Sequence, residues 1–151
     1  MSVELREAKR EDLPALLGLY AQLTNGTPSA APGDASVSLA ALDRVLRSDR
    51  RHLLVAVIDG EVVGTADLAV IENLTHHATP WGIVENVVVR DDMRRRGVGS
   101  ALFAEIEKIA RAANCHKVGL LSGKHRPEAH VFYEQAGYRP VAEGFKLYFD
   151  R

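Results

Sequence analysis

The chain has 151 residues, about the length of one domain, of which 46% are hydrophobic and 26% charged. A domain of this size buries roughly two thirds of its unfolded surface, so it can form a core without metals or disulfides. The formal net charge of −1 excludes a global basic field that would attract nucleic acid or an anionic membrane, so any anion site is expected to be local.

The single cysteine and the short apolar stretches favour a cytoplasmic protein. Cys115 has no second cysteine with which to form an intramolecular disulfide, which suits a reducing compartment. Residues 1–7 are charged and lack the apolar run of a signal peptide. The longest aliphatic stretch, residues 53–58, is far too short to span a bilayer, so no membrane association is expected.

The first third of the chain predicts one strand and two helices. Residues 3–8 alternate weakly between apolar and polar side chains, which favours a short strand. Apolar residues recur at helical spacing over residues 13–23 and again over residues 39–46. Between these helices, residues 25–36 are rich in Gly, Pro, Ser and Ala and predict a mobile loop.

The middle of the chain predicts a hairpin followed by a central strand. The dipeptide Asp59-Gly60, a favoured hairpin turn, separates the apolar residues 53–58 from residues 61–71. A polar loop follows at residues 73–80. The β-branched residues 82–90 then predict a strand in the interior of the sheet.

The last third predicts two more helices and two more strands. One helix begins near Gly97, and residues 117–121 predict a strand after it. Pro127 at the start and Gly137 just past the end bracket the other helix. Residues 145–149 alternate between apolar and polar side chains and predict the strand that closes the sheet.

The order of these elements predicts a single domain over residues 1–151, of the α/β (α+β mixed) class. Hairpins and strand–helix–strand units both occur, so the sheet is expected to be mixed, with helices on both faces. The sequence contains no internal repeat and no low-complexity segment.

The most informative stretch runs from residue 87 to residue 102, where a buried strand is followed by a basic, glycine-containing turn and a helix start. The turn consists of Arg94, Arg95, Arg96, Gly97, Val98, Gly99 and Ser100. Glycine lets the backbone approach a ligand closely, and a helix start presents unpaired N–H groups and a positive dipole end. With the arginine charges, the segment predicts a cradle for a pyrophosphate. The alternative is a helix N-terminus with solvated arginines.

Two better-known phosphate-binding loops are excluded by the spacing. A dinucleotide-binding fingerprint requires a third glycine three residues after Gly99, and Leu102 occupies that position. A P-loop requires a Gly-Lys-Ser/Thr ending, which the turn lacks.

Glu85 is the candidate general base, because it lies in the middle of an otherwise nearly apolar strand. Burial of an unpaired carboxylate is costly, so the pKa of Glu85 is expected to rise toward the range useful for a base. The alternative is a structural glutamate paired with an arginine or a backbone amide. Asp67, on the neighbouring hairpin strand, is a weaker candidate for the same role.

Tyr133 is the candidate general acid. A phenol on a helix that faces the sheet can protonate a leaving thiolate, although an aromatic residue at helical spacing is more often part of the core. Helical spacing alone therefore leaves the core interpretation preferred.

Two motifs together resemble the GNAT superfamily of N-acetyltransferases. The first is Arg94-Arg95-Arg96-Gly97-Val98-Gly99, and the second is Phe132-Tyr133-Glu134-Gln135-Ala136-Gly137-Tyr138. The resemblance covers roughly residues 53–149 well and the two N-terminal helices loosely. It implies a central mixed, largely antiparallel sheet of six to seven strands, with about four helices on both faces and a V-shaped split between the fourth and fifth strands.

The resemblance also implies acetyl-CoA as co-substrate and direct transfer of its acetyl group to a primary amine. The pantetheine arm would hydrogen-bond to the main chain of Val87, Val88 and Val89, and the pyrophosphate would lie on the amides of residues 95–100. By the same resemblance Tyr133 is the general acid and Glu85 activates the amine, commonly through water.

One position departs from the family pattern. Many relatives carry asparagine three residues before the alanine at position 129, where this chain has Arg126. The basic cluster Lys124-His125-Arg126 can meet the 3′-phosphate of CoA or an anionic substrate, or it can form a solvated loop.

The acceptor amine is expected near His76, His77 and Trp81, which precede the strand that carries Glu85. Adjacent imidazoles point in different directions on an extended chain and no third ligand is evident, so no metal is expected. Segments of the chain also resemble aminoalkylphosphonate and glucosamine-phosphate acetyltransferases, whose substrates are anionic amines. Neither likeness identifies the acceptor.

Three other interpretations remain open. A non-catalytic acyl-CoA sensor would keep the phosphate cradle but would not require Glu85 and Tyr133 together. A protein or peptide amine acetyltransferase is compatible with the same motifs. A nucleic-acid binder built on the three arginines lacks a wider basic face, so no nucleic-acid partner is expected. The family resemblance implies a possible homodimer.

Overall fold

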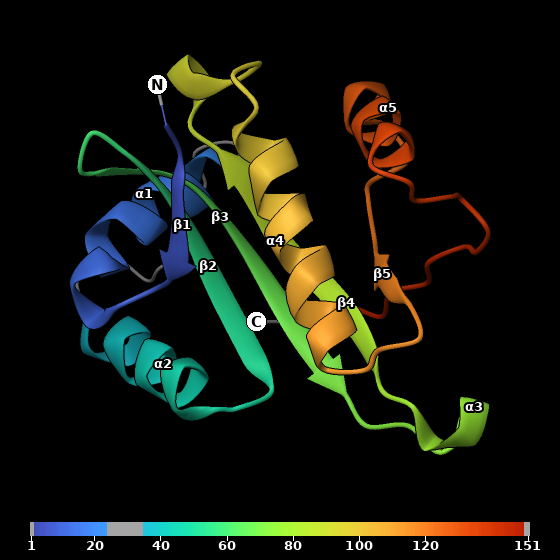
Figure 1. Ribbon diagram of the computed structural model, residues 1–151. Helices are drawn as coiled ribbons and strands as arrows, with labels where there is room; N and C mark the ends of the chain where they lie inside the picture. Colours follow the sequence, from blue (N-terminus) through green and yellow to red (C-terminus); the bar gives the residue numbers. More distant parts are fainter. Residues whose placement is uncertain (1, 24–34, 150–151) are drawn as a thin grey trace.

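The computed structural model describes residues 2–23 and 35–149, and within them five strands form one sheet (Figure 1). The strands are β1 (Glu4–Glu7), β2 (Arg51–Ile58), β3 (Glu61–Ile71), β4 (Trp81–Val89) and β5 (Val118–Leu120). They lie in the order of the sequence, with β1 to β4 antiparallel and β5 parallel to β4. The predicted mixed, largely antiparallel sheet is confirmed.

Helices cover both faces of the sheet, as the sequence predicted. They are α1 (Leu13–Leu23), α2 (Ala35–Arg47), α3 (Thr75–Ala78), α4 (Val98–Ala112) and α5 (Pro127–Gln135), with 3-10 turns η1 (Arg10–Asp12) and η2 (Asp91–Met93). α1 and α2 pack on one face and α4 on the other, and α5 lies beside the first turns of α4 (Figure 1). Of the loop predicted at residues 25–36, residues 25–34 lie outside the described residues, and the last two begin α2.

The core has two layers because β2 is buried on both faces. Alternate side chains of a strand point to opposite faces. One set of alternate β2 residues therefore packs on α4, and the other set packs on α1 and α2. On the α4 side the buried side chains include Leu54, Ala56, Ile58, Leu102 and Ile106. On the α1 and α2 side they include Leu16, Leu42, Leu53, Val55 and Val57. Among the described residues no helix is long and apolar enough to cross a bilayer.

The hairpin turn and the helix ends follow the predicted residue chemistry. Asp59 and Gly60 both have positive φ, 50° and 79°, as a tight turn between twisted strands requires. Pro127 stands at the start of α5, and Gly137 has a φ of 97° just after its end. These local signals are therefore confirmed.

A bulge in β4 creates the split in the sheet. Asp67 pairs with Glu85 and Thr65 pairs with Val88, so two residues of β4 lie opposite the single residue Ala66 of β3. One of the two, Asn86, has a positive φ of 52°. A bulge bends its strand and increases its twist. The pairing of β4 with β5 covers only residues 82–84 of β4 and ends just before Glu85, so the split between the fourth and fifth strands is confirmed.

The predicted number of strands, six to seven, is wrong, because residues 145–149 form no strand. This segment includes Phe145, Leu147 and Phe149, whose side chains are all largely exposed. An isolated extended segment is not stable in water unless its backbone groups pair with a neighbouring strand. Alternating apolar residues indicate a surface that pairs or packs, but they do not say which chain supplies the partner.

Candidate active site

A cavity of about 210 Å³ opens where β4 and β5 separate. Its walls come from the end of α1, from β4 and β5, from the loop before α5, from α5 itself and from the C-terminal segment. The lining residues are Leu23, Val84, Glu85, Asn86, Val87, Leu120, Leu121, Ser122, Gly123, Arg126, Tyr133 and Lys146. The cavity therefore brings Glu85 and Tyr133, which are 48 positions apart by their residue numbers, to one site.

Glu85 is exposed, so the burial predicted for it from the apolar strand is wrong. The sequence shows an almost continuous apolar run, but β5 covers β4 only as far as Val84. Glu85 is the first β4 residue beyond this pairing, and the bulge follows it directly. It therefore lies at the open mouth of the split, where a solvated ammonium group or a water molecule can reach its carboxylate.

Tyr133 is half-buried and keeps its proton over the physiological pH range. Its ring contacts those of Phe103 and Phe132, with centroids 5.7 Å and 5.6 Å away. Burial raises the pKa of the Tyr133 phenol above its usual value, and the charge of Arg126 partly opposes this shift. A protonated phenol that lines a cavity is suited to give its proton to a leaving group.

The strand past the bulge leaves backbone groups near the cavity. Val87 lines the cavity directly. Val88 is buried and Val89 is half-buried, and they pair with Thr65 and Gly64 of β3. The side of this strand that faces away from β3 has no β5 neighbour at these positions. Its backbone N–H and C=O groups are therefore placed to hydrogen-bond an extended ligand.

The basic turn ends in the N-terminus of α4. Gly97 is the N-cap residue, with a left-handed φ of 81° and no side-chain hydrogen bond to the helix. The first helical bond runs from the N–H of Ala101 to the carbonyl of Gly97, at 3.0 Å. The N–H groups before Ala101 therefore lack intrahelical acceptors and are available to an anion.

The two glycines of the turn are required for different reasons. Gly97 has open space around its missing Cβ, and its positive φ is the feature that favours glycine. A Cβ on Gly99 would lie 3.1 Å from the ring of Phe132, so glycine here allows α5 to pack closely on α4. Gly99 thus serves the packing of the two helices, and the role predicted for both glycines in close approach of a ligand stays a prediction.

Ion pairs fix the connection between β4 and α4. Arg90 binds Asp92 and Glu61, with N–O distances of 2.6 Å and 3.0 Å. Arg94 pairs with Asp91 at 2.8 Å, so part of the positive charge predicted for the turn is compensated within it. The backbone amide of Asp91 donates a 3.0 Å hydrogen bond to the side chain of Gln22, which ties the turn to α1.

His76, His77 and Trp81 lie at the opposite end of β4 from the basic turn and do not line the cavity. The ring of His76 stacks on that of His116, with centroids 4.1 Å apart, and Lys117 Nζ lies 4.9 Å from the Trp81 ring. His76 and His77 both have left-handed φ values, so the predicted polar loop contains a left-handed turn. Their role toward the acceptor stays a prediction.

Two features in and near the site were not predicted from the sequence. Lys146 lines the cavity from the C-terminal segment, and its only sequence signal is a charged residue between apolar neighbours. Asp67 is buried and forms a two-point ion pair with Arg51. Because these partners are 16 positions apart on different strands, no short motif reveals the pair.

Two further side-chain features bear on metal and thiol chemistry. Across residues 2–23 and 35–149, no group of three or more His, Cys, Asp or Glu side chains is arranged to hold a metal ion. Burial raises the pKa of the Cys115 thiol, which disfavours the nucleophilic thiolate.

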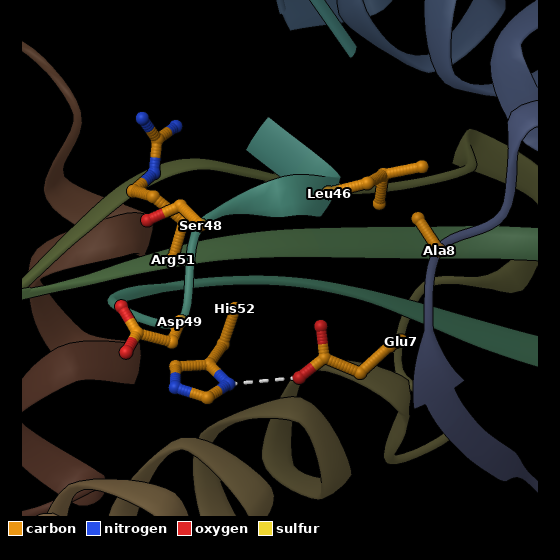
Figure 2. A pocket seen from close by; sticks show the side chains of 7 residues that line it. All are labelled: Glu7, Ala8, Leu46, Ser48, Asp49, Arg51 and His52. Atoms are coloured by element: carbon orange, nitrogen blue, oxygen red, sulfur yellow. Dashed lines mark hydrogen bonds and ion pairs between the residues drawn. The ribbon is translucent and has the colours of Figure 1, made fainter. Parts of the chain in front are cut away.

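A larger cavity, of about 510 Å³, lies between the end of α2 and strands β1 and β2 (Figure 2). It is lined by Glu7, Ala8, Leu46, Ser48, Asp49, Arg51 and His52. His52 Nδ1 lies 2.8 Å from a carboxylate oxygen of Glu7. No residue of the basic turn and no tyrosine lines this cavity, so its size alone does not make it the reaction site.

Comparison with known proteins agrees with this geometry. The model of the acetyltransferase (GNAT) family matches residues 17–138. A glucosamine 6-phosphate N-acetyltransferase of Trypanosoma brucei brucei is 32% identical over 151 residues, covering 97% of this chain and 96% of its own. An aminoalkylphosphonate N-acetyltransferase of Salmonella typhimurium is 32% identical, covering 90% and 84%. A structure from Agrobacterium tumefaciens attributed to an acetyltransferase has a TM-score of 0.89 and 36% identity, covering 97% and 99%.

Proposed function

Because this chain belongs to the acetyltransferase (GNAT) family and is an acetyl-CoA-dependent N-acetyltransferase, we propose that it acetylates a small primary amine that also carries an anionic group. The family assignment confirms the resemblance seen in the two sequence motifs. The observation that carries the proposal is the cavity between β4 and β5, because a carboxylate, a phenol and two cationic side chains meet in it.

The residues present fit acetyl-CoA as co-substrate. The free N–H groups at the start of α4 suit its pyrophosphate, and the unpaired edge of β4 at Val87, Val88 and Val89 suits the amide groups of its pantetheine arm. These two features lie at the same end of β4, so one extended molecule can contact both. Its thioester would then enter the split beside Tyr133.

The reaction needs a proton removed from the amine and a proton supplied to sulfur. Glu85, through a water molecule, takes the proton of the ammonium group, and the freed nitrogen forms a bond to the thioester carbonyl carbon. A backbone N–H near Val87 stabilises the oxyanion that develops on this carbonyl. As the carbon–sulfur bond breaks, Tyr133 gives its proton to the thiolate, which leaves as the free thiol of CoA. The nitrogen loses its second proton as the amide forms, and this proton restores the neutral phenol of Tyr133.

The charges of the cavity favour an acceptor of mixed charge. Glu85 is the acidic side chain of the lining, and Arg126 and Lys146 are its two basic side chains. An ammonium group beside Glu85 leaves the two cations to pair with a phosphate or phosphonate on the same molecule. The named substrates of the two relatives, glucosamine 6-phosphate and aminoalkylphosphonates, combine these groups. In this proposal Arg126 binds the anionic group of the acceptor instead of the 3′-phosphate of CoA.

The test is release of free thiol from acetyl-CoA across matched amines. We expect glucosamine 6-phosphate or an aminoalkylphosphonate to exceed its counterpart without the anionic group, glucosamine or an alkylamine, by about tenfold or more in kcat/KM. Lys146→Ala should lower kcat/KM for the anionic amine and leave the KM for acetyl-CoA unchanged. Lys108→Ala, an exposed lysine on α4, is the control.

Other outcomes separate the alternatives. Equal rates for amines with and without an anionic group would contradict the anionic acceptor but would leave the acetyltransferase activity in place. Acetylation of lysine peptides alone would favour a protein substrate. Binding of acetyl-CoA with no thiol release on any amine would favour an acyl-CoA sensor.

We also propose that the C-terminal segment packs against a second copy of the chain. Phe145 and Leu147 are 88% and 80% exposed, whereas Lys146 between them lines the cavity. β5 is the edge of the sheet and only three residues long, so its outer side offers backbone groups to another strand. Large exposed apolar side chains gathered in one segment mark an interface.

This arrangement predicts a homodimer in solution. Light scattering coupled to size-exclusion chromatography should give twice the mass of the 16.5 kDa chain. Replacing Phe145 and Leu147 by serine should shift the protein toward the monomer, whereas Leu74→Ser, at another exposed leucine, should not. A monomeric wild-type protein at micromolar concentration would contradict the proposal.

A further inference from the structure

One face of the sheet carries a row of charged side chains that ends at Glu85. Leu53 of β2, Asp67 of β3 and Glu85 of β4 are direct cross-strand neighbours in the register of the sheet. Side chains on paired residues of adjacent strands lie on the same face. Arg51 is two residues before Leu53, so it shares this face and reaches diagonally toward Asp67. Asp67 therefore lies between Arg51 and Glu85.

The contact between Arg51 and Asp67 is made through two hydrogen bonds. Arg51 Nε donates to Asp67 Oδ1 at 3.1 Å, and the terminal Nη2 donates to Oδ2 at 2.5 Å. The Asp67 side chain is 9% exposed, against 37% for Arg51. Two-point pairing of a guanidinium with a carboxylate fixes both groups in orientation as well as in distance.

Asp67 and Glu85 both act on the guanidinium of Arg51. The hydrogen bonds from Arg51 to Asp67 raise the pKa of Arg51 most, and the negative charge of Glu85 adds to the shift, so Glu85 lies within electrostatic reach of Arg51. In the larger cavity, the side chain of Arg51 points away from His52 and Glu7, which bind each other (Figure 2).

Other polar and titratable side chains lie around this row of charged residues. Tyr20 of α1 covers it, and burial raises the pKa of the Tyr20 phenol, with a further contribution from the charge of Asp67. Thr65 precedes Asp67 on the same face and donates its hydroxyl to the carbonyl of Leu54 at 2.7 Å. On the cavity side of Glu85 the polar and charged side chains include Arg126, Tyr133 and Lys146.

We propose that Asp67 is a positioning residue that holds the Arg51 guanidinium away from Glu85 and so keeps the Glu85 carboxylate open to the acceptor ammonium. The inference rests on the role proposed above for Glu85. Without Asp67, the guanidinium loses its two hydrogen-bond acceptors while its positive charge remains. Glu85, the next carboxylate along the row, is then its partner, and the amine has to displace an arginine from the base.

The Asp67→Asn substitution tests this role, because it removes the charge and keeps the shape. We expect kcat/KM for the amine to fall by about tenfold or more, a coupling usual for residues in contact, while the KM for acetyl-CoA stays unchanged. Glu72→Gln, which breaks the neighbouring Arg50–Glu72 ion pair, is the matched control and should change neither quantity.

The double variant Arg51→Gln, Asp67→Asn separates positioning from simple structural support. It removes the positive charge of Arg51 together with the carboxylate of Asp67 that binds it, so kcat/KM for the amine should return to within about threefold of wild type. If the double variant is as impaired as Asp67→Asn, or more so, Asp67 supports the fold only and the proposal is overturned. Circular dichroism confirms that each variant is folded.

Two further measurements keep this result distinct from the proposed function. A Glu85→Gln variant with wild-type kcat/KM overturns the role of Glu85, and the positioning role with it. An impaired Glu85→Gln beside an unaffected Asp67→Asn overturns the positioning role alone. A crystal structure of Asp67→Asn needs no acceptor: Arg51 should lie within 4 Å of a Glu85 oxygen, the usual limit for an ion pair, and an Arg51 that stays in place contradicts the proposal.

Discussion

Replacing Tyr133 by phenylalanine should lower kcat by about 10²–10⁴-fold, the range usual for loss of a general acid. The substitution removes only the hydroxyl, so the ring keeps its contacts with Phe103 and Phe132. The affinity for acetyl-CoA should change little, because the proton of Tyr133 is needed only as the thiolate departs. Steady-state kinetics with a saturating amine, together with calorimetric binding of acetyl-CoA, measure both quantities.

Tyr138 provides the matched control for this experiment. Its ring also packs on Phe103, with centroids 5.5 Å apart, and burial raises its pKa to about 12. Tyr138 does not line the cavity, so Tyr138→Phe should leave kcat near the wild-type value. Equal losses in the two variants would show that the tyrosine hydroxyls support packing and not proton transfer. A parallel loss of acetyl-CoA binding in Tyr133→Phe would also contradict the general-acid role.

Leu102→Ala should lower the free energy of unfolding by about 2–5 kcal/mol, the range for deleting a buried leucine side chain. Leu102 is fully buried in α4, and its Cδ1 lies 3.4 Å from the position of a Cβ at Gly64. The cavity left behind would be lined by apolar side chains of both α4 and the sheet. Urea unfolding followed by circular dichroism gives the change in midpoint and slope.

Leu74→Ala is the control for the core substitution. The Leu74 side chain is 93% exposed, so its truncation should change stability by no more than about 0.5 kcal/mol. Leu102 lies in the second turn of the helix whose first N–H groups form the anion site. We therefore expect the weakened helix also to bind acetyl-CoA less tightly. Similar unfolding midpoints for the two variants would contradict the placement of Leu102 in the core.

The parts of the fold that were predicted correctly depend on local chemistry. Asp59 and Gly60 tolerate positive φ, Pro127 suits the first turn of a helix, and Gly97 suits a left-handed N-cap. In each case the residue type limits the backbone conformation by itself, so the signal survives without knowledge of the tertiary structure. The mixed character of the sheet followed from the hairpin and from the strand–helix–strand units.

The parts that failed depend on contacts between distant segments. The predicted burial of Glu85 was wrong because the apolar run around it does not reveal that β5 ends at Leu120. The strand predicted at residues 145–149 was wrong because alternation does not identify a partner. The pair of Arg51 with Asp67 was missed because it depends on the register of the folded sheet. Lys146 was missed because its place in the cavity depends on the path of the C-terminal segment after α5.

The candidate site shows the same difference between residues in local motifs and residues whose place depends on the tertiary structure. The basic turn and Tyr133 lie in short motifs, and the structure places Tyr133 in one cavity with Glu85. His76 and His77 precede the strand of Glu85 and Trp81 begins it, but a strand of nine residues separates its ends by roughly 27 Å. Proximity along an extended strand is therefore a weak guide to proximity in a site.

The bulge at Asn86 shifts by one residue the alternation of β4 side chains between the two faces of the sheet. Before it, Trp81, Ile83 and Glu85 share the face of α1, and after it Val88 occupies that face although its number is even. Removing one residue between Glu85 and Val88 would leave both side chains on this face but would remove the bulge, and with it the bend that separates β4 from β5. The strand should thus accept many changes of residue type but few changes of length, unlike the polar loop that precedes it.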